Sequence, residues 1–181
     1  LIMKVDIICP LYNAEKYINK CVDSLLRQTK KEIVFILIND GSTDNTDSLL
    51  REYKDKRIKY FKNKIQGIGK TRNFGIDKAK GKYLMFIDSD DYVEPTMLED
   101  LYNTAKEQDA DIVWCDWFLT FAENERYMKQ PSFCSPIEAL KAMLSGGMKY
   151  NVWNKLVRRT LYTGNSIEFP AGYGMGEDMT M

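Results

Sequence analysis

The stretch IVFILINDGSTD at residues 33–44 decides the fold class of this chain of 181 residues. Its first six residues, 33–38, are apolar on both faces, which is typical of a central strand covered on each side by helices. The polar turn at residues 39–44 closes that strand. Such a strand requires neighbouring strands and covering helices, and the flanking sequence supplies both.

Strand-like and helix-like segments alternate around this stretch. Short β-branched or apolar runs predict strands, and apolar residues at helical spacing predict helices. Asn13 is expected to cap the first of these helices. We therefore predict an α/β fold with a largely parallel sheet flanked by helices. The predicted strands are residues 4–9, 33–38, 58–61 and 83–87, and the predicted helices are residues 17–26, 47–53 and 70–79.

The second half of the chain continues the pattern. Residues 95–106 predict a further helix and residues 112–121 predict a single strand. The run SPIE at residues 135–138 begins another helix, with a serine cap, a first-turn proline and a capping-box glutamate. Two glycines at residues 146–147 end that helix. No repeat, low-complexity stretch or linker divides the chain, so residues 1–181 are expected to form one domain.

The composition excludes several classes of function. The chain has 26 Lys and Arg residues against 26 Asp and Glu residues, so no net positive field attracts nucleic acid or an anionic membrane. It has no histidine, which removes Ser-His-Asp triads, histidine bases and imidazole zinc sites. Acid–base chemistry therefore falls mostly on carboxylates.

Cysteine spacing and hydropathy bear on the compartment. The four cysteines show no C-x-x-C spacing, which fits buried, reduced thiols in a reducing compartment. The longest purely apolar run covers only residues 33–38, far short of the roughly 18 residues that span a bilayer, and no basic-then-apolar leader opens the chain. We therefore expect a cytoplasmic protein without a transmembrane segment.

The strongest chemical signal is the run DSDD at residues 88–91, directly after the strand at residues 83–87. Ligands of open α/β sheets bind at this end of the strands. At ~4 Å, each pair of carboxylates repels by about 1 kcal/mol in water and by more where solvent is excluded. A divalent cation relieves this repulsion, and oxygen ligands favour Mg²⁺ or Mn²⁺. The alternative is that Asp90 or Asp91 caps the helix after Pro95.

The turn at residues 39–44 also has two interpretations. Its polar side chains lie at the carboxyl end of the second strand, where they would meet a ligand. Alternatively, it is a strand-to-helix turn in which Gly41 permits a positive φ and an Asp or Ser caps the next helix.

Two glycine-rich motifs are excluded at residues 67–73, GIGKTRN. A Walker A loop requires glycine where Lys64 stands, and the dinucleotide fingerprint requires a third glycine where Arg72 stands. What remains is a flexible loop that presents Lys70 and Arg72 at a helix start, where anions bind. A solvated basic helix face is the alternative.

Five motifs follow one another along the chain: PLYN at residues 10–13, NDGSTD at 39–44, G-x-G-x-x-R-N at 67–73, DSDD at 88–91 and ED at 177–178. Each motif is weak alone, but their order and spacing on an alternating β/α pattern are specific. Together they resemble the family 2 glycosyltransferases, and the resemblance covers nearly the whole chain. It implies the GT-A fold, a Rossmann-like mostly parallel sheet, together with a nucleotide-sugar donor, a divalent metal and inversion at the anomeric carbon.

The resemblance also implies which residues bind the donor. Asp90 or Asp91 would reach the metal on the diphosphate, and Asp88 and Asp90 would hold the ribose and the donor sugar. Asp40 would accept a hydrogen bond from the uracil N–H. The rest of the nucleotide site would be formed by Pro10, Tyr12 and Glu15 around the base and by Lys70 and Arg72 near the nucleotide.

For catalysis, Asp178 matches the position of the family's general base, which removes the proton of an acceptor hydroxyl as its oxygen attacks C1. The glycine-rich residues 172–176 before it suggest a loop that closes over the acceptor. Trp153 and Glu177 would line the acceptor cleft, although Trp153 is alternatively a core residue. The chain ends three residues beyond Asp178, so the domain is expected to be truncated at its C-terminal end.

These features predict a metal-assisted, inverting transfer of a sugar from a UDP-sugar to a hydroxyl of a saccharide or lipid-linked acceptor. By analogy, this transfer belongs to bacterial polysaccharide assembly, at the inner face of the membrane if the missing C-terminal region associates with it. One alternative is a non-catalytic module that binds nucleotide sugars or glycans. Another is a nucleotidyltransferase, although residues 10–13 lack the glycine-rich phosphate loop typical of that class.

Overall fold

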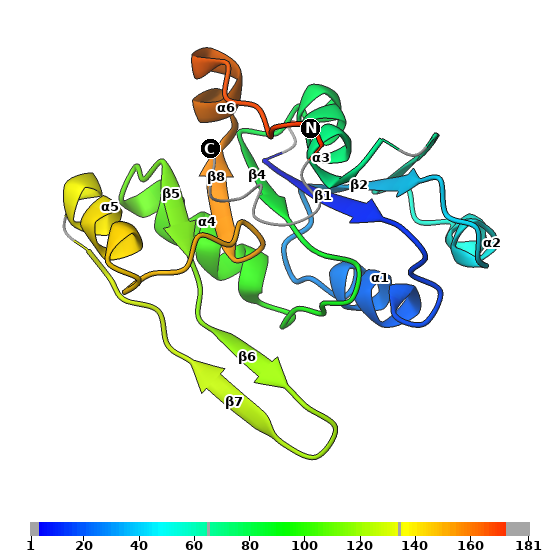
Figure 1. The fold of residues 1–181 in the computed structure, drawn as a ribbon, viewed down its shortest axis with the longest axis horizontal. Coiled ribbons are helices and arrows are strands. Elements are labelled where there is room, and N and C mark those ends of the chain that lie inside the picture. The colour runs from blue at the N-terminus through cyan, green and yellow to red at the C-terminus, as the bar shows by residue number, and fades with distance from the viewer. Residues whose placement is uncertain (1–3, 65, 134, 173–181) are drawn as a thin grey trace.

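Four parallel strands form one side of a six-stranded sheet in the computed structural model, which describes residues 4–64, 66–133 and 135–172. The strand β8 (Lys155–Arg158) follows them in the sheet and runs antiparallel to both of its neighbours. The order is β3-β2-β1-β4-β8-β5 (Figure 1), so the predicted mostly parallel sheet is confirmed. The other strands are β1 (Val5–Leu11), β2 (Ile33–Asp40), β3 (Ile58–Asn63), β4 (Tyr83–Phe86) and β5 (Ile112–Trp114).

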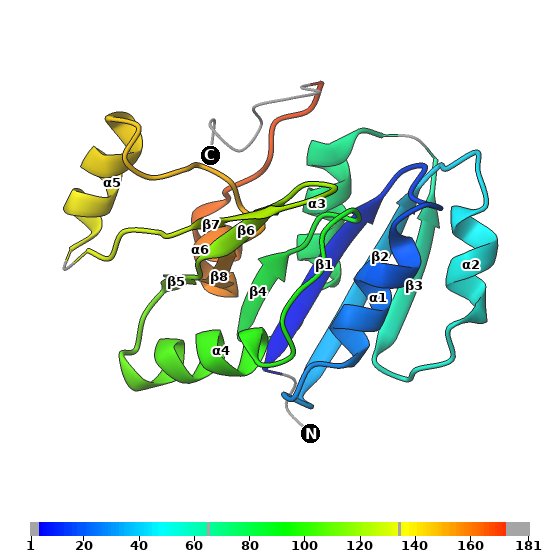
Figure 2. The same ribbon diagram turned by 90° about the horizontal axis from the view of Figure 1, so that it is seen from below.

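Helices cover both faces of this sheet (Figure 2). One face packs against α1 (Ile18–Leu26), α2 (Thr46–Glu52) and α4 (Met97–Glu107), and the opposite face packs against α3 (Ile68–Lys78) and α6 (Arg159–Asn165). All eight residues of β2 are buried, as expected for a strand that is apolar on both faces. In the described part of the chain, no helix is both long enough and apolar enough to cross a membrane.

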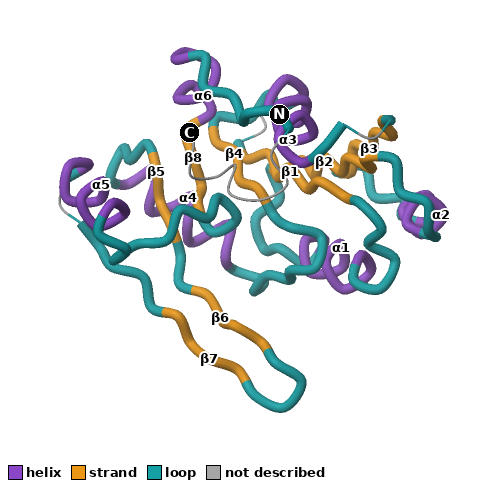
Figure 3. Tube along the Cα trace, in the orientation of Figure 1, coloured by secondary structure: helices purple, strands orange, loops and turns teal. Residues whose placement is uncertain are grey.

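The single strand expected at residues 112–121 is wrong. The chain leaves the sheet after β5, and β6 (Trp117–Thr120) pairs instead with β7 (Glu125–Met128) in a separate antiparallel hairpin. Asp116 stabilises this change of chain direction, because its carboxylate accepts hydrogen bonds from the Gln130 N–H and the Tyr127 hydroxyl. The hairpin therefore projects from the rest of the molecule (Figure 3).

Two predicted helix starts have different outcomes. Ser135 caps α5 (Pro136–Leu144) as predicted, with its hydroxyl 3.3 Å from the Glu138 N–H. Asn13 does not cap α1, because it has a φ of 50° and its side chain accepts a hydrogen bond from the Thr43 N–H at 2.8 Å. That contact joins two loops that lie thirty residues apart in sequence, so a local capping pattern could not reveal it.

Candidate functional site

The candidate site lies where the strand order reverses, between the carboxyl ends of β1 and β4. From β1 the chain proceeds to β2 and β3 on one side and then returns to β4 on the other. The Ile87 N–H donates to the Ile8 carbonyl at 3.1 Å, so the ends of β1 and β4 stay in register. The loops that follow the two strands separate at this point, which is where open α/β sheets bind their ligands.

The loop after β1 is tied to the loop after β2. The Ala14 N–H donates to the buried Thr46 hydroxyl at 2.8 Å, and the Asn13 N–H donates to Ser42 Oγ at 3.0 Å. Glu15 takes part in the same connection, since its Oε2 accepts hydrogen bonds from the backbone and side-chain N–H groups of Asn45, both at 3.0 Å. The contacts of Glu15 that the structure shows therefore hold the loop together.

Two further predicted base-pocket residues differ in exposure. Pro10 is buried within β1. Tyr12 is exposed at the edge of the loop, with 55% of its surface accessible. An exposed phenol ring beside a site offers a flat apolar surface, which suits stacking on a nucleobase.

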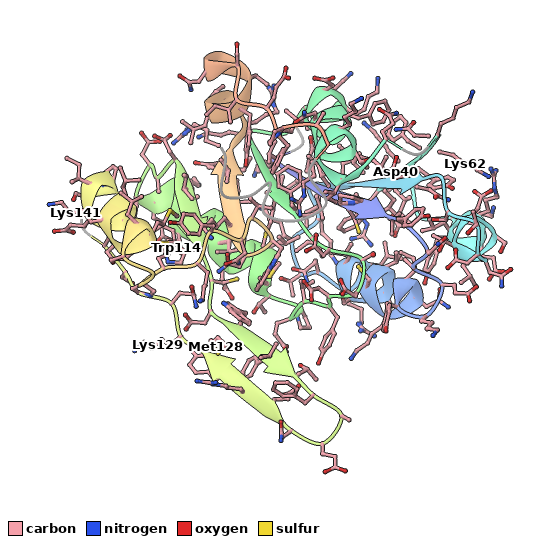
Figure 4. All side chains as sticks on the ribbon, in the orientation of Figure 1. Asp40, Lys62, Trp114, Met128, Lys129 and Lys141 are labelled. Atoms are coloured by element: carbon pink, nitrogen blue, oxygen red, sulfur yellow. The ribbon has the colours of Figure 1, made fainter. Side chains whose placement is uncertain are left out.

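Asp40, the last residue of β2, is buried and holds the start of the glycine loop. Its Oδ1 accepts a hydrogen bond from the Gln66 N–H and its Oδ2 accepts one from the Gly67 N–H, both at 2.9 Å. Gly67 has a φ of 89°, a conformation that a residue with a side chain rarely adopts. Figure 4 shows Asp40 at the end of its strand, near Lys62 on β3.

Asn63 is a residue of the site that the motifs did not indicate. It is the last residue of β3 and the register partner of Asp40. Its amide nitrogen is buried, and no hydrogen-bond partner for it occurs among the residues that the structure describes. A buried donor without a partner is costly unless a ligand completes it. Strand pairing is the signal that identifies Asn63, because it places this residue beside Asp40.

Arg72 and Asp88 form the central ion pair of the site. The Arg72 side chain is 3% exposed, and its Nη2 lies 3.3 Å from Oδ1 of Asp88, which is 34% exposed. The guanidinium also lies over the rings of Phe86 and Phe169, with 5.6 and 5.2 Å to the ring centroids. The pair therefore fixes one carboxylate of the acidic loop and leaves part of it open to solvent.

Lys70 does not share the surroundings of Arg72. The two residues are two positions apart on α3, so their side chains leave the helix in different directions. Lys70 is exposed and lines a pocket of about 550 Å³ between α3 and α6, together with Asn73, Asp77 and Tyr162. The structure thus brings Arg72, and not Lys70, to the acidic loop.

The acidic loop itself, residues 88–91, is a tight turn in which the Asp91 N–H donates to the Asp88 carbonyl at 3.1 Å. Asp90 is exposed and Asp91 is half-buried. Burial, followed by the negative charges of Asp88 and Asp90, raises the pKa of Asp91 to about 6. The three carboxylates therefore interact unfavourably, as the sequence predicted.

Neither Asp90 nor Asp91 caps the next helix. That helix, α4, begins after Thr96 without a side-chain cap. Gln28 caps this helix instead, because its Oε1 accepts a hydrogen bond from the Leu98 N–H at 3.1 Å. Its Nε2 also donates to the Glu94 carbonyl at 2.7 Å, in the loop before the helix. The interpretation that Asp90 or Asp91 caps this helix is thus wrong.

The donor set of this loop fits a hard divalent cation. Burial, followed by the negative charges of Asp88 and Asp90, disfavours the ionised form of Asp91 and raises its pKa, and a bound cation would offset both causes. Within the described residues, however, no group of three Cys, Asp or Glu side chains lies close enough together to hold a metal ion. One or two carboxylates would be the protein's share, as in Mg²⁺ sites completed by substrate phosphates and water.

The predicted acceptor side is only partly described. Trp153 is half-buried and meets Trp117 edge to face, with 5.0 Å between the ring centroids, whereas Leu156 is a core residue. Trp153 therefore packs on the base of the β6–β7 hairpin. Glu177 and the predicted base Asp178 lie outside the described residues, as do residues 173–176 of the glycine-rich segment.

Comparisons with known proteins agree with the resemblance in sequence. The family model Glycosyl transferase family 2 matches residues 6–177. The chain is 34% identical over 177 residues to the putative glycosyltransferase EpsH of Bacillus subtilis (strain 168), which covers 92% of this chain and 50% of EpsH. It is 30% identical over 182 residues to the poly(ribitol-phosphate) beta-N-acetylglucosaminyltransferase TarS of Staphylococcus aureus (strain MW2), which covers 97% of this chain and 31% of TarS.

A solved structure shares the fold. The crystal structure of S. aureus TarS 1–349 in complex with UDP-GlcNAc superposes with a TM-score of 0.81 at 28% sequence identity, over 97% of this chain and 51% of that one. The predicted GT-A architecture is thereby confirmed. The chain spans about half the length of EpsH and of this TarS structure.

Proposed function

The chain belongs to glycosyl transferase family 2, and we propose that it transfers a sugar from a UDP-sugar to a hydroxyl group of a saccharide or lipid-linked acceptor. The observation that carries this proposal is that Asp40, at the end of β2, and the Arg72–Asp88 ion pair, whose Asp88 follows β4, lie at the same carboxyl-terminal edge of the sheet. TarS, which shares the fold at 28% identity, has been solved in complex with UDP-GlcNAc. Because the chain spans about half of its relatives, the complete protein's substrates are part of the proposal.

The base of the donor would lie between the loops after β1 and β2. The exposed ring of Tyr12 supplies a stacking surface, and Pro10 and Glu15 support the loop beneath it. Each carboxylate oxygen of Asp40 accepts one loop hydrogen bond and keeps a second lone pair, which can accept the uracil N–H. The amide nitrogen of Asn63 is a donor for a carbonyl oxygen of the base.

The diphosphate and sugar would lie along the acidic loop. Arg72 orients Asp88 toward the ribose and the donor sugar, and Asp90 extends from the same turn. Asp90 and Asp91 would hold Mg²⁺ or Mn²⁺, because burial and the two neighbouring carboxylates make ionisation of Asp91 unfavourable without a cation. When bound, such an ion neutralises charge on the departing diphosphate.

The reaction would be a single in-line displacement. The acceptor oxygen forms a bond to C1 as the bond between C1 and the diphosphate oxygen breaks, which inverts the anomeric centre. Asp178 would accept the proton of the acceptor hydroxyl. A carboxylate is the expected base in a chain without histidine.

Thermal unfolding of the chain with UDP, UDP-GlcNAc, GDP and ATP, each with and without Mn²⁺, tests the donor half of the proposal. A ligand at 100 times its Kd stabilises a protein by about 2.7 kcal/mol. We expect stabilisation by UDP and UDP-GlcNAc that increases with Mn²⁺. Stabilisation by ATP and not by UDP would instead indicate a nucleotidyltransferase.

Variants test the catalytic half. Asp178→Asn is expected to retain UDP and Mn²⁺ binding while sugar transfer is lost, whereas Asp90→Ala is expected to weaken Mn²⁺-dependent UDP binding itself. Glu107→Gln, at the exposed end of α4, is the charge-matched control. Undiminished transfer by Asp178→Asn would contradict the assignment of the base. UDP binding by a chain that transfers no sugar to any acceptor would favour a non-catalytic binding module.

A further inference from the structure

The β6–β7 hairpin has one face that combines exposed aromatic rings with polar groups. Its register places Phe118 opposite Tyr127 and Thr120 opposite Glu125, so these four side chains share one side of the hairpin. We call this the aromatic face. The rings of Phe118 and Tyr127 lie 5.3 Å apart between centroids, and these two side chains are 54% and 53% exposed. Large exposed aromatic rings on a projecting element are typical of an interaction surface.

The aromatic face is continuous with the acidic loop. Tyr92 directly follows Asp91, and its hydroxyl lies 3.4 Å from both Thr120 Oγ1 and Glu125 Oε1. Figure 2 shows the hairpin at the level of the carboxyl ends of the parallel strands. A ligand bound along this face would therefore have one end at Tyr92, beside the proposed site of sugar transfer. The rest of the ligand would extend along the hairpin, away from that site.

The hairpin is held in a defined position. A two-stranded hairpin is marginally stable alone, so its orientation depends on contacts with the rest of the protein. Trp117 packs edge to face on Trp153, and the Tyr127 hydroxyl donates a hydrogen bond to the Asp116 carboxylate. Trp117 lies on the opposite side of the hairpin, and Tyr127 uses only its hydroxyl in the contact with Asp116, so about half of Phe118 and half of Tyr127 stay exposed on the aromatic face.

The chemistry of the aromatic face suits a saccharide. Sugar rings present an apolar face of C–H groups, which packs on aromatic rings, and an edge of hydroxyl groups, which pair with hydroxyl and carboxylate oxygens. The charge of the hairpin opposes an anionic lipid surface, because Glu123 and Glu125 lie at its tip beside the single cation Arg126. The rings and polar groups together favour an uncharged or weakly charged oligosaccharide.

We propose that the aromatic face, together with Tyr92, binds an oligosaccharide segment of the acceptor whose reacting end lies at the acidic loop. This inference rests on the proposed function and makes it more specific. The acceptor is a chain of several sugar units, and the units behind the reacting one contribute to its affinity through Phe118 and Tyr127.

A glycan array that carries each oligosaccharide as a series from one to six units tests this proposal. The fluorescently labelled chain is applied to the array with UDP and Mn²⁺ present. We expect affinity to rise with chain length, and the Phe118→Ser/Tyr127→Ser variant to lose about tenfold for the longer members. Tyr127→Phe keeps the ring and is expected to retain binding. Ile137→Ser/Leu144→Ser removes two apolar side chains from α5 that are even more exposed, at 65% and 74%, and is the matched control.

Each contrary result is informative. Absence of binding across the array, no dependence on chain length, or unchanged affinity in the Phe118→Ser/Tyr127→Ser variant would overturn the proposal. Sedimentation of the chain with phosphatidylglycerol vesicles, lost in the same variant, would show that the face binds a membrane instead. Thermal stabilisation by UDP in the variant shows that it is folded. If the unaltered chain binds glycans but no nucleotide, the proposed function is contradicted, whereas the proposal that the aromatic face binds an oligosaccharide is supported.

Discussion

Arg72 places a permanent cation where almost no water reaches it. Burial of a guanidinium is unfavourable unless it is paired, and here Asp88 and two aromatic rings compensate it. The planar group also makes fixed contacts that a lysine ammonium would not reproduce. The same pair orients the first carboxylate of the acidic loop, so the stability of α3 and the shape of the proposed donor site depend on one residue.

We expect Arg72→Met to weaken UDP binding by about tenfold, equivalent to about 1.4 kcal/mol, because Asp88 loses its positioning partner. Isothermal titration calorimetry with UDP and Mn²⁺ measures this. Lys70→Met removes the same charge from a residue that faces the α3–α6 pocket, and a change below about threefold is expected for this control. An equal loss in both variants would place the Lys70 ammonium at the nucleotide after all.

Asp91 makes stability depend on pH without metal. Its pKa is raised to about 6 from an ordinary value of 3.8, so protonation of Asp91 stabilises the folded state relative to the unfolded state. This contribution is complete below the ordinary pKa and is lost as the pH rises through about 6. We therefore expect Asp91→Asn to stabilise the metal-free protein at pH 7.5 and to have little effect near pH 4, as measured by urea unfolding in EDTA.

The matched control for this prediction is Asp77→Asn, which removes a carboxylate from the exposed side of α3. A bound divalent cation favours ionised Asp91, so Mn²⁺ affinity is expected to fall as the pH drops below about 6. Stability of Asp91→Asn equal to that of the unaltered chain at pH 7.5 would contradict the burial and repulsion that raise this pKa.

At the scale of elements, α3 begins directly after Gly67 and contains Arg72, and it packs very close to the sheet. A Cβ at Gly75 would lie 2.3 Å from Ile8 Cγ2 and 3.1 Å from Ile38 Cδ1, so only glycine fits there. These two side chains belong to β1 and β2, the strands whose ends form the site. The close packing of α3 on these two strands therefore fixes the position of Arg72 relative to their carboxyl ends.

Gly75→Ala is expected to destabilise the protein by about 1–3 kcal/mol, since α3 must move away from β1 and β2. Gly164→Ala is the matched control, because nothing lies within 4 Å of a Cβ at that position in α6. Alanine favours a helix over glycine by up to about 1 kcal/mol, so this control is expected to be neutral or slightly stabilising. Urea unfolding of both variants measures the difference, and equal stabilities would contradict the close packing.

At the scale of the whole molecule, the sheet and its covering helices differ from the segment that follows β5. The strands β1 and β2 are buried along their full length, and both faces carry apolar clusters. By contrast, α5 has no buried residue, and β6 has one half-buried residue followed by three exposed ones. The protein therefore combines a stable core with an appended segment that has little burial of its own.

Hydrogen exchange is expected to reveal this division. Amides of α5 and of the β6–β7 hairpin should exchange through local opening well before those of β1 and β2, which open only with the core. Mass spectrometry of peptides from both regions measures the rates. Protection in α5 equal to that in β2 would mean that the appended segment opens only with the core, contrary to the low burial of its side chains.

Much of the fold and part of the site could be predicted from sequence because the relevant patterns are local. The apolar run of β2 predicts a central strand, and serine followed by proline predicts the start of α5. The acidic loop after β4 could also be recognised, since three carboxylates within four residues at a strand end have few structural uses. Continuous burial, capping and charge repulsion all act between residues that are close together along the chain.

Only the tertiary structure decided which of these groups meet. The pairing of Arg72 with Asp88, the position of Asn63 beside Asp40 and the capping of α4 by Gln28 join residues that are far apart in the sequence or lie on different elements. The hairpin after β5 also depends on Asp116, whose partners come from β7 and beyond. Sequence periodicity reports the surroundings of a residue along its own element, whereas partner choice depends on the packing of elements against one another.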